Sequence, residues 1–234
     1  LVAARAKEEG ARYIPICAKT EEDIADYSPE EKKAFLAEMG IEASGLDTVT
    51  QYELWKGTWS SIKDRNFWEL AWALDRHAGM CRGFVPQTFI GNHDVTRIAS
   101  EVGDDGAVLA ATALFTLPGM PSVYYGDEQA FQGRKLEGLH ADDELRPPLP
   151  ASPAELSPAG EWMYRIYQRL IGLRRRNPWL SRGRLKVIAK ENAWIEYRMS
   201  GDAPDQDLRV RLALEPQCSA TVMCGGETAF HWER

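Results

Sequence analysis

Apolar residues in the middle of the chain recur at helical spacing in several stretches, and shorter apolar runs separate these stretches. Within residues 66–77, for example, Phe67, Leu70 and Leu74 fall on one face, as in a helix that packs against a core. Strands and helices thus alternate, which is typical of a parallel α/β architecture. The predicted helices span residues 66–77, 103–117 and 161–176, and the predicted strands span residues 49–55, 84–90 and 122–125.

The pattern changes after Gly183 to short apolar runs separated by turn residues. Such runs indicate strands that pair with their neighbours in an antiparallel sheet. A proline-rich, acidic stretch over residues 136–158 precedes this part and predicts a long loop, of the kind that borders a site or a domain junction. The predicted strands are residues 185–189, 193–199, 208–214, 219–223 and 228–232.

The first part of the chain reads as an α/β unit of its own. Residues 1–9 have helical propensity, and residues 13–17 form a short apolar run typical of a buried strand. A second helix has Ser28 as its N-cap, Pro29 at its first position and Gly40 as its stop.

The composition describes a globular, acidic protein. Hydrophobic residues make up 44% of the 234 residues, which is enough for a core, and the formal net charge is −7. An excess of carboxylates repels nucleic acids and anionic membranes, so neither is an expected partner. No apolar run approaches the ~18 residues of a membrane span, and the first residues become charged too soon for a secretory signal, so we expect a cytosolic protein.

The four cysteines do not form a metal-binding pattern. Cys17, Cys81, Cys218 and Cys224 contain no Cys-x-x-Cys pair and do not cluster with histidines. We therefore expect free thiols, no metal site and no cofactor.

The run Asn92-His93-Asp94 follows the predicted strand at residues 84–90. Asn and Asp are common helix N-caps, and for the tripeptide alone capping is the more frequent role. The functional alternative is a site at the carboxyl end of a strand, where barrel enzymes place their working side chains.

Two longer runs, in this order along the chain, favour the functional alternative. Phe89-Ile90-Gly91-Asn92-His93-Asp94 resembles the fourth signature region of the α-amylase superfamily, glycoside hydrolase family thirteen. Residues 119–128 resemble the last barrel strand of that family and the turn after it. The resemblance covers roughly residues 47–234. It implies an α/β fold made of a partial (β/α)8 barrel, about its last three strand-helix units, and a small C-terminal antiparallel β-domain.

The resemblance also implies a role for each residue of the tripeptide. Asp94 would be the third carboxylate of the family, which holds sugar hydroxyls and stabilises the oxocarbenium-like transition state. His93 would donate a hydrogen bond from Nε2 or Nδ1 to the same sugar. Asn92 would orient the turn or its neighbour. The implied partner is an α-glucan or a maltooligosaccharide, which the family hydrolyses or transfers. The nucleophile and the general acid come from upstream barrel strands, so we expect this chain to be inactive alone.

The first 47 residues resemble a different family, the Obg-like (YchF-type) P-loop ATPases. Cys17-Ala18-Lys19 would correspond to their base-side loop, and residues 44–47 are a plausible junction between two families' fragments. No Gly-x-x-x-x-Gly-Lys-Ser/Thr run occurs, so ATP or GTP binding is disfavoured. The implied domains are residues 1–47, 48–182 and 183–234.

The remaining candidates are expected to be structural. Asp127-Glu128 would cap a turn, Trp55 and Trp59 would belong to the core, and His140 would be a solvated loop residue. The basic run at residues 174–176 ends a predicted helix, where cations stabilise the helix dipole. Three barrel strands leave two open edges, so self-association is a further expectation.

Overall fold

The computed structural model describes residues 48–138 and 140–234. The chain divides into two units, residues 1–47 and Thr48–Arg234, and the described residues all belong to the second unit. The strand expected at residues 13–17 and the helix expected after Ser28 lie outside the described residues.

Three short parallel segments stand side by side in chain order. Thr50 forms a parallel bridge to Gln87, and β1 (Gln87–Thr88) pairs in parallel with β2 (Met120–Pro121). The parallel arrangement is as predicted, but the strands are much shorter than expected. The prediction of a strand at residues 122–125 was wrong, because the pairing ends at Pro121 and Gly126, with a φ of 89°, already belongs to the following turn.

The prediction of a strand through residues 52–55 was also wrong. Helix α4 (Tyr52–Lys63) begins directly after the bridge at Thr50. Leu54, Thr58 and Ser61 are buried, and their spacing of four and three residues is that of one helix face. The aromatic residues of this stretch hid that periodicity in the sequence.

Three further helices complete this part of the fold. They are α5 (Trp68–Met80), α6 (Ile98–Thr116) and α7 (Glu161–Arg176). Helix α7 has the bounds predicted from its amphipathic pattern. Helix α6 begins five residues before the predicted start at Gly103, because that glycine, at a φ of 73°, links two helical segments.

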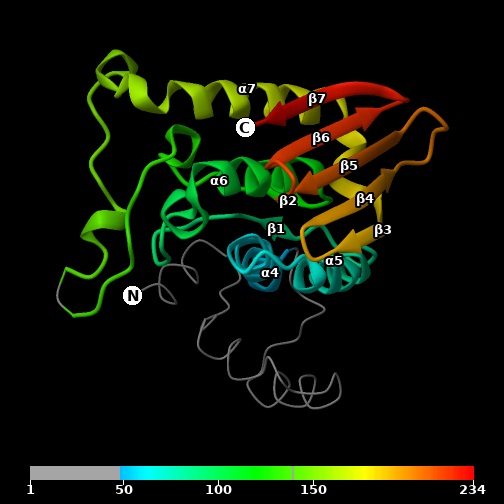
Figure 1. Cartoon of the computed structure of the whole chain (residues 1–234), viewed down its shortest axis with the longest axis horizontal. Coiled ribbons are helices and arrows are strands. Elements are labelled where there is room, and N and C mark those ends of the chain that lie inside the picture. Colours follow the sequence, from blue (N-terminus) through cyan, green and yellow to red (C-terminus); the bar gives the residue numbers. More distant parts are fainter. Residues whose placement is uncertain (1–47, 139) are drawn as a thin grey trace, which may run out of the picture. The chain divides into compact units, whose positions relative to one another are not determined.

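The C-terminal part is the expected antiparallel sheet, with strand order β3-β4-β5-β6-β7. Alternate side chains are buried in β4, β5 and β6, as in β4, where Ile195, Tyr197 and Met199 are fully shielded. The sheet, orange to red in Figure 1, lies beside α5, α6 and α7, and one continuous apolar core joins it to them. The strands are β3 (Arg184–Glu191), β4 (Trp194–Ser200), β5 (Asp207–Ala213), β6 (Ser219–Cys224) and β7 (Glu227–Glu233).

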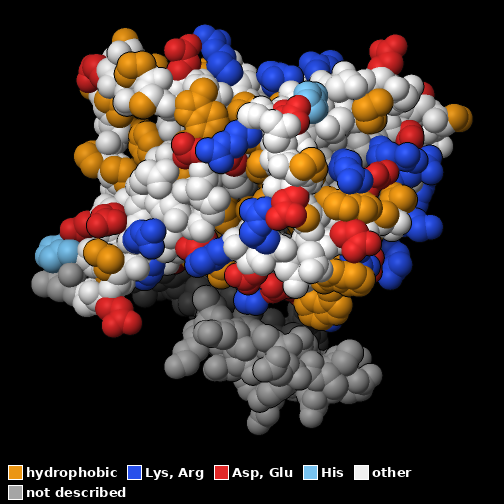
Figure 2. All heavy atoms as spheres, viewed as in Figure 1, with side chains coloured by type: hydrophobic (Ala, Val, Ile, Leu, Met, Phe, Trp, Pro, Cys, Tyr) orange, Lys and Arg blue, Asp and Glu red, His pale blue; other side chains and the backbone are white. Residues whose placement is uncertain are grey.

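The stretch between β2 and α7 is a long loop, as its prolines predicted. It contains short 3-10 turns, among them η2 (Asp127–Gln129) and η3 (Asp143–Leu145), and the Leu145 side chain is fully buried. Positive and negative side chains are interspersed over the described part of the face in Figure 2. Across residues 48–138 and 140–234, the helices are too short or too polar to cross a bilayer.

Candidate functional site

The turn after β1 carries the three residues that the sequence singled out. The Asn92 carboxamide oxygen accepts a hydrogen bond from the Asp94 backbone N–H at 2.9 Å, and the Asn92 amide donates to the Tyr52 hydroxyl at 3.3 Å. This Asx-type contact bends the chain locally. Asn92 therefore shapes the turn that presents Asp94.

The side chains of His93 and Asp94 face solvent next to each other. His93 Nε2 lies 3.2 Å from Asp94 Oδ2, and both side chains are more than half exposed. None of the described residues covers this carboxylate completely, so a polar ligand can reach it past this part of the chain.

Arg146, which the sequence analysis did not single out, holds this turn from the long loop. Its Nη2 lies 3.1 Å from Asp94 Oδ1, and its Nε donates to the His93 carbonyl at 3.1 Å. The same Nη2 lies 2.7 Å from Asp142 Oδ2. A hydrogen bond from Lys135 lowers the pKa of Asp142 most, and the charges of Arg146 and His93 add to this effect. The sequence feature that could have pointed to Arg146 is its opposite charge to Asp142, four residues earlier.

Arg97 fixes the loop that carries Arg146. The Arg97 side chain is fully buried, and it donates to the carbonyls of Leu145, at 2.8 Å, and Tyr125. The Tyr124 and Tyr125 hydroxyls donate to the carbonyls of Leu145 and Pro147. The residues on both sides of Arg146 are thus tied to the turn after β2, which places the Arg146 guanidinium at Asp94.

Asp127 lies in the interior beneath the candidate site. Its carboxylate Oδ1 is 3.1 Å from Arg97 Nη1, and the residue is only 2% exposed. Burial raises the pKa of Asp127 to about 7, against the lowering effect of the Arg97 charge. Glu128 accepts a hydrogen bond from the Gly126 N–H. Both contacts are internal to the protein and match the expected structural role.

A pocket of about 250 Å³ adjoins Asp94. Trp55 and Trp59 line it, and the centroids of their rings are 5.8 Å apart. Both were expected in the core, and Trp59 does pack against it, but each indole is only half-buried and shares this pocket with the candidate carboxylate. The other lining residues are Ile90, Val95, Thr96, Ile98, Glu101 and Lys135.

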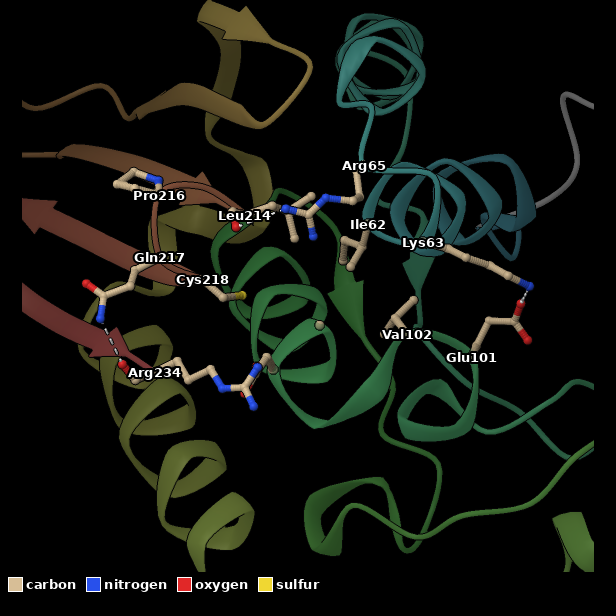
Figure 3. A pocket seen from close by; sticks show the side chains of 12 residues that line it. Ile62, Lys63, Arg65, Glu101, Val102, Leu214, Pro216, Gln217, Cys218 and Arg234 are labelled. Carbon is tan, nitrogen blue, oxygen red and sulfur yellow. Dashed lines mark hydrogen bonds and ion pairs between the residues drawn. The ribbon is translucent and has the colours of Figure 1, made fainter.

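A larger pocket, of about 440 Å³, lies between α4, α6 and the turn after β5 (Figure 3). It contains none of the three predicted site residues. Charged side chains of its lining form ion pairs within the protein. Lys63 Nζ lies 2.5 Å from Glu101 Oε1, and Arg234 Nη1 lies 2.9 Å from Asp105 Oδ2. The Cys218 thiol also lines it, and burial raises the pKa of that thiol to about 11.

Two other side chains named from the sequence have local roles. His140 is 71% exposed and lies 3.0 Å from Asp143. Arg174 is half-buried and donates to the carbonyls of Phe115, Leu117 and Gly119, which satisfies acceptors at and beyond the end of α6. Among the described residues, no group of three or more His, Cys, Asp or Glu side chains could hold a metal ion.

The comparison with protein families gives a clear assignment. The family described as alpha amylase, catalytic domain, matches residues 16–150, which is more than half of the chain. The chain therefore belongs to the alpha-amylase family.

Individual proteins match parts of the chain. A 4-alpha-glucanotransferase of Thermotoga maritima is 29% identical over 203 residues, covering 73% of this chain and 46% of its own length. The chain thus spans about half of that relative. The solved structure of AmyP in complex with maltose has a TM-score of 0.67 over 86% of this chain and 51% of its own, at 16% identity, so the likeness concerns the fold. The ribosome-binding ATPase YchF of Bacillus subtilis is 52% identical over 41 residues, covering 18% of this chain and 11% of its own length.

Proposed function

We propose that this chain is the α-glucan-binding part of an alpha-amylase family enzyme, with Asp94 as its substrate-facing carboxylate. The observation that carries the proposal is the exposed Asp94 carboxylate, presented after a parallel strand and bordered by a pocket with two indole rings. His93 and Asn92 complete the set, with His93 as a donor to the sugar and Asn92 as the residue that bends the turn.

The relatives support the class of ligand. The Thermotoga maritima protein is named a 4-alpha-glucanotransferase, and AmyP was solved in complex with maltose. The whole enzyme would either hydrolyse its substrate or transfer a glucan chain, since its relatives include both an alpha-amylase and a 4-alpha-glucanotransferase. A cytosolic location stays a prediction.

The chemistry around Asp94 favours binding without turnover by this chain alone. Retaining glycosidases need a nucleophilic carboxylate and a protonated carboxylic acid about 5 Å apart. Asp142, which shares Arg146 with Asp94, has a lowered pKa and is committed to Lys135 and Arg146, so it is a poor proton donor. Asp127 has a raised pKa, but it is buried and forms an ion pair with Arg97, so a substrate cannot reach it.

Incubation of the chain with maltotriose, followed by an assay for new reducing ends, tests this proposal together with a binding titration. We expect binding that is weakened by Asp94→Asn, and no turnover above that of the same variant. Turnover that depends on Asp94 would contradict the proposal that this chain lacks a nucleophile and a general acid. A lack of any maltotriose binding would contradict the proposed α-glucan-binding function.

A second candidate, a nucleotide-binding module in residues 1–47, is supported by the short match to YchF. In that case the chain joins fragments of two families near residues 44–47. The alpha-amylase match begins at residue 16 and so overlaps the same segment, which argues against the junction. Calorimetric titration with ATP and GTP distinguishes the two, and micromolar affinity would favour the module.

The third candidate is a non-catalytic carbohydrate-binding or structural protein that self-associates through the open edges of its short parallel strands. Sedimentation of the chain at several concentrations tests the self-association. A concentration-dependent mass is the expected result, and a monomer at all concentrations would contradict it.

A further inference from the structure

The pocket that Trp55 and Trp59 line beside Asp94 has the properties of a sugar-binding site. Its volume of about 250 Å³ is just below the ~300 Å³ at which drug-sized ligand pockets begin. It therefore suits a single small unit, such as one sugar ring. We propose that this pocket is a separate glucose subsite, in which the indoles of Trp55 and Trp59 pack against the glucose unit next to the one that Asp94 contacts. This inference rests on the proposed function.

Both indoles are held in place before any ligand arrives. The Trp55 ring lies nearly parallel to the Phe89 ring, at 10° and 6.0 Å between centroids. The Lys63 ammonium lies over the Trp59 ring, 5.5 Å from its centroid, while its charge is paired with Glu101. Rigid aromatic side chains offer a large contact area at a low entropy cost, which suits the flat C–H face of a pyranose.

The polar groups of the pocket favour a neutral ligand. Glu101 is paired with Lys63, and Lys135 is paired with Asp142. Asp94 is balanced by Arg146. Because each of these charges already has a counter-charge, an ionic ligand gains little here, whereas the hydroxyls of a sugar find both donors and acceptors.

One buried donor also lacks an acceptor. The indole N–H of Trp59 is shielded from solvent and has no hydrogen-bond partner among the residues that the structure describes. Buried polar groups are nearly always paired, so this donor is an exception that calls for an explanation. The N–H is closed to water in the sugar-free protein, so a sugar hydroxyl in the pocket would become its acceptor only after a small shift of the indole or of the side chains that cover it.

A second pair of tryptophans on α5 provides a matched control. Trp68 and Trp72 are 51% and 57% exposed, and the Trp68 indole N–H already donates to Asn192 at 2.9 Å. They line neither of the two pockets described above. If exposure to solvent alone made an indole respond to sugar, Trp68 and Trp72 would respond more strongly than Trp59.

The test is a titration of the full chain, labelled with 5-fluorotryptophan, with maltotriose. Its ¹⁹F resonances are assigned by single Trp→Phe substitutions. We expect the resonances of Trp55 and Trp59 to shift with one common dissociation constant and those of Trp68 and Trp72 to stay. Trp59→Leu should weaken maltotriose binding about threefold to tenfold, the range for an aromatic contact, and Trp72→Leu should not.

Three results decide between the two proposals. Binding that is weakened by Asp94→Asn, with unshifted Trp55 and Trp59 resonances, overturns the subsite and leaves the proposed function standing. A lack of any binding overturns the proposed function as well. Shifts at Trp55 and Trp59 that persist in Asp94→Asn at a weaker affinity support both. The resonance shifts of the unsubstituted chain remain a readout even if Trp59→Leu does not fold.

Discussion

Gly91 and Asp127 approach each other so closely that a Cβ built on Gly91 would lie 2.4 Å from Asp127 Oδ2. Gly91 belongs to the turn that presents Asp94, and Asp127 to the turn after the neighbouring strand. The two sequence motifs therefore form one packed unit. The glycine is required here by a contact with the other motif, and its own backbone angle is ordinary.

Substitution Gly91→Ala should destabilise the protein by about 1 to 3 kcal/mol, the usual cost of overpacking a filled interior. Asp127 cannot move away easily, because it is buried and paired with Arg97. Urea unfolding followed by circular dichroism measures the effect. The control is Gly79→Ala near the end of α5, where the new Cβ meets only the Arg82 side chain at 3.6 Å. That variant should be neutral or more stable by up to about 1 kcal/mol, and equal losses in both variants would refute the packing argument.

Arg97 and Arg146 both form ion pairs near this turn, but their contributions to stability should differ strongly. The pair of Arg97 with Asp127 is fully buried, and removal of one partner leaves an unmatched group in the interior, at a typical cost of about 3 to 5 kcal/mol. The pairs of Arg146 are 27% to 54% exposed, and such pairs contribute at most about 1 kcal/mol.

The measurement is the free energy of unfolding of Arg97→Met and Arg146→Met under identical conditions. A large loss is expected only for Arg97→Met. Similar losses for both would mean that Arg146 organises the loop and does not merely border the site. Because Arg146 binds Asp94, the same variant should change maltotriose binding while the fold is retained.

The sequence predicted periodic elements better than short ones. The amphipathic pattern of α7 and the alternation in β3 to β7 reflect burial on one face, and both elements lie where expected. The parallel strands have only two residues each, too few for a period, and the apolar run at residues 49–55 continued into helix α4.

The candidate site was indicated by the sequence only where its residues form a local motif. Asn92, His93 and Asp94 are adjacent in the chain, so the motif alone brought them together. Arg146 reaches Asp94 from 52 residues away, through a loop held by the buried Arg97. The indoles of Trp55 and Trp59 join the pocket from α4, whose first turn was predicted as the end of a strand. No local pattern encodes these long-range contacts.

Arg174 should matter more for stability than its neighbour Arg175. It donates hydrogen bonds to three backbone carbonyls beyond and at the end of α6, whereas Arg175 is exposed. Arg174→Met leaves these acceptors without their donor and should cost about 1 to 3 kcal/mol or more. Arg175→Met should stay within about 0.5 kcal/mol of the parent. Thermal unfolding of the two variants compares them directly, and equal stabilities would show that water replaces the guanidinium at no cost.

His77 should make the stability depend on pH below neutrality. Its Nε2 donates to the Pro118 carbonyl at 2.8 Å, so Nδ1 is the acceptor for the Gln51 amide at 3.3 Å. Burial lowers the pKa of His77, and the hydrogen bond to Pro118 offsets this only in part. Protonation would place a second N–H against the Gln51 donor, inside the core.

The sign of the effect follows from the lowered pKa. The unfolded chain binds the proton at a pKa of about 6.5, and the folded protein does so only at a lower pH. The contribution of neutral His77 is therefore complete above about pH 6.5, and it is lost as the pH falls toward the folded-state value. We expect the free energy of unfolding to fall more between pH 7.5 and pH 5.5 in the parent than in His77→Gln. The control is His231→Gln at a half-exposed histidine of β7, which should retain the parent's pH dependence. If His77→Gln and the parent lose stability equally over this range, His77 does not titrate as its burial requires.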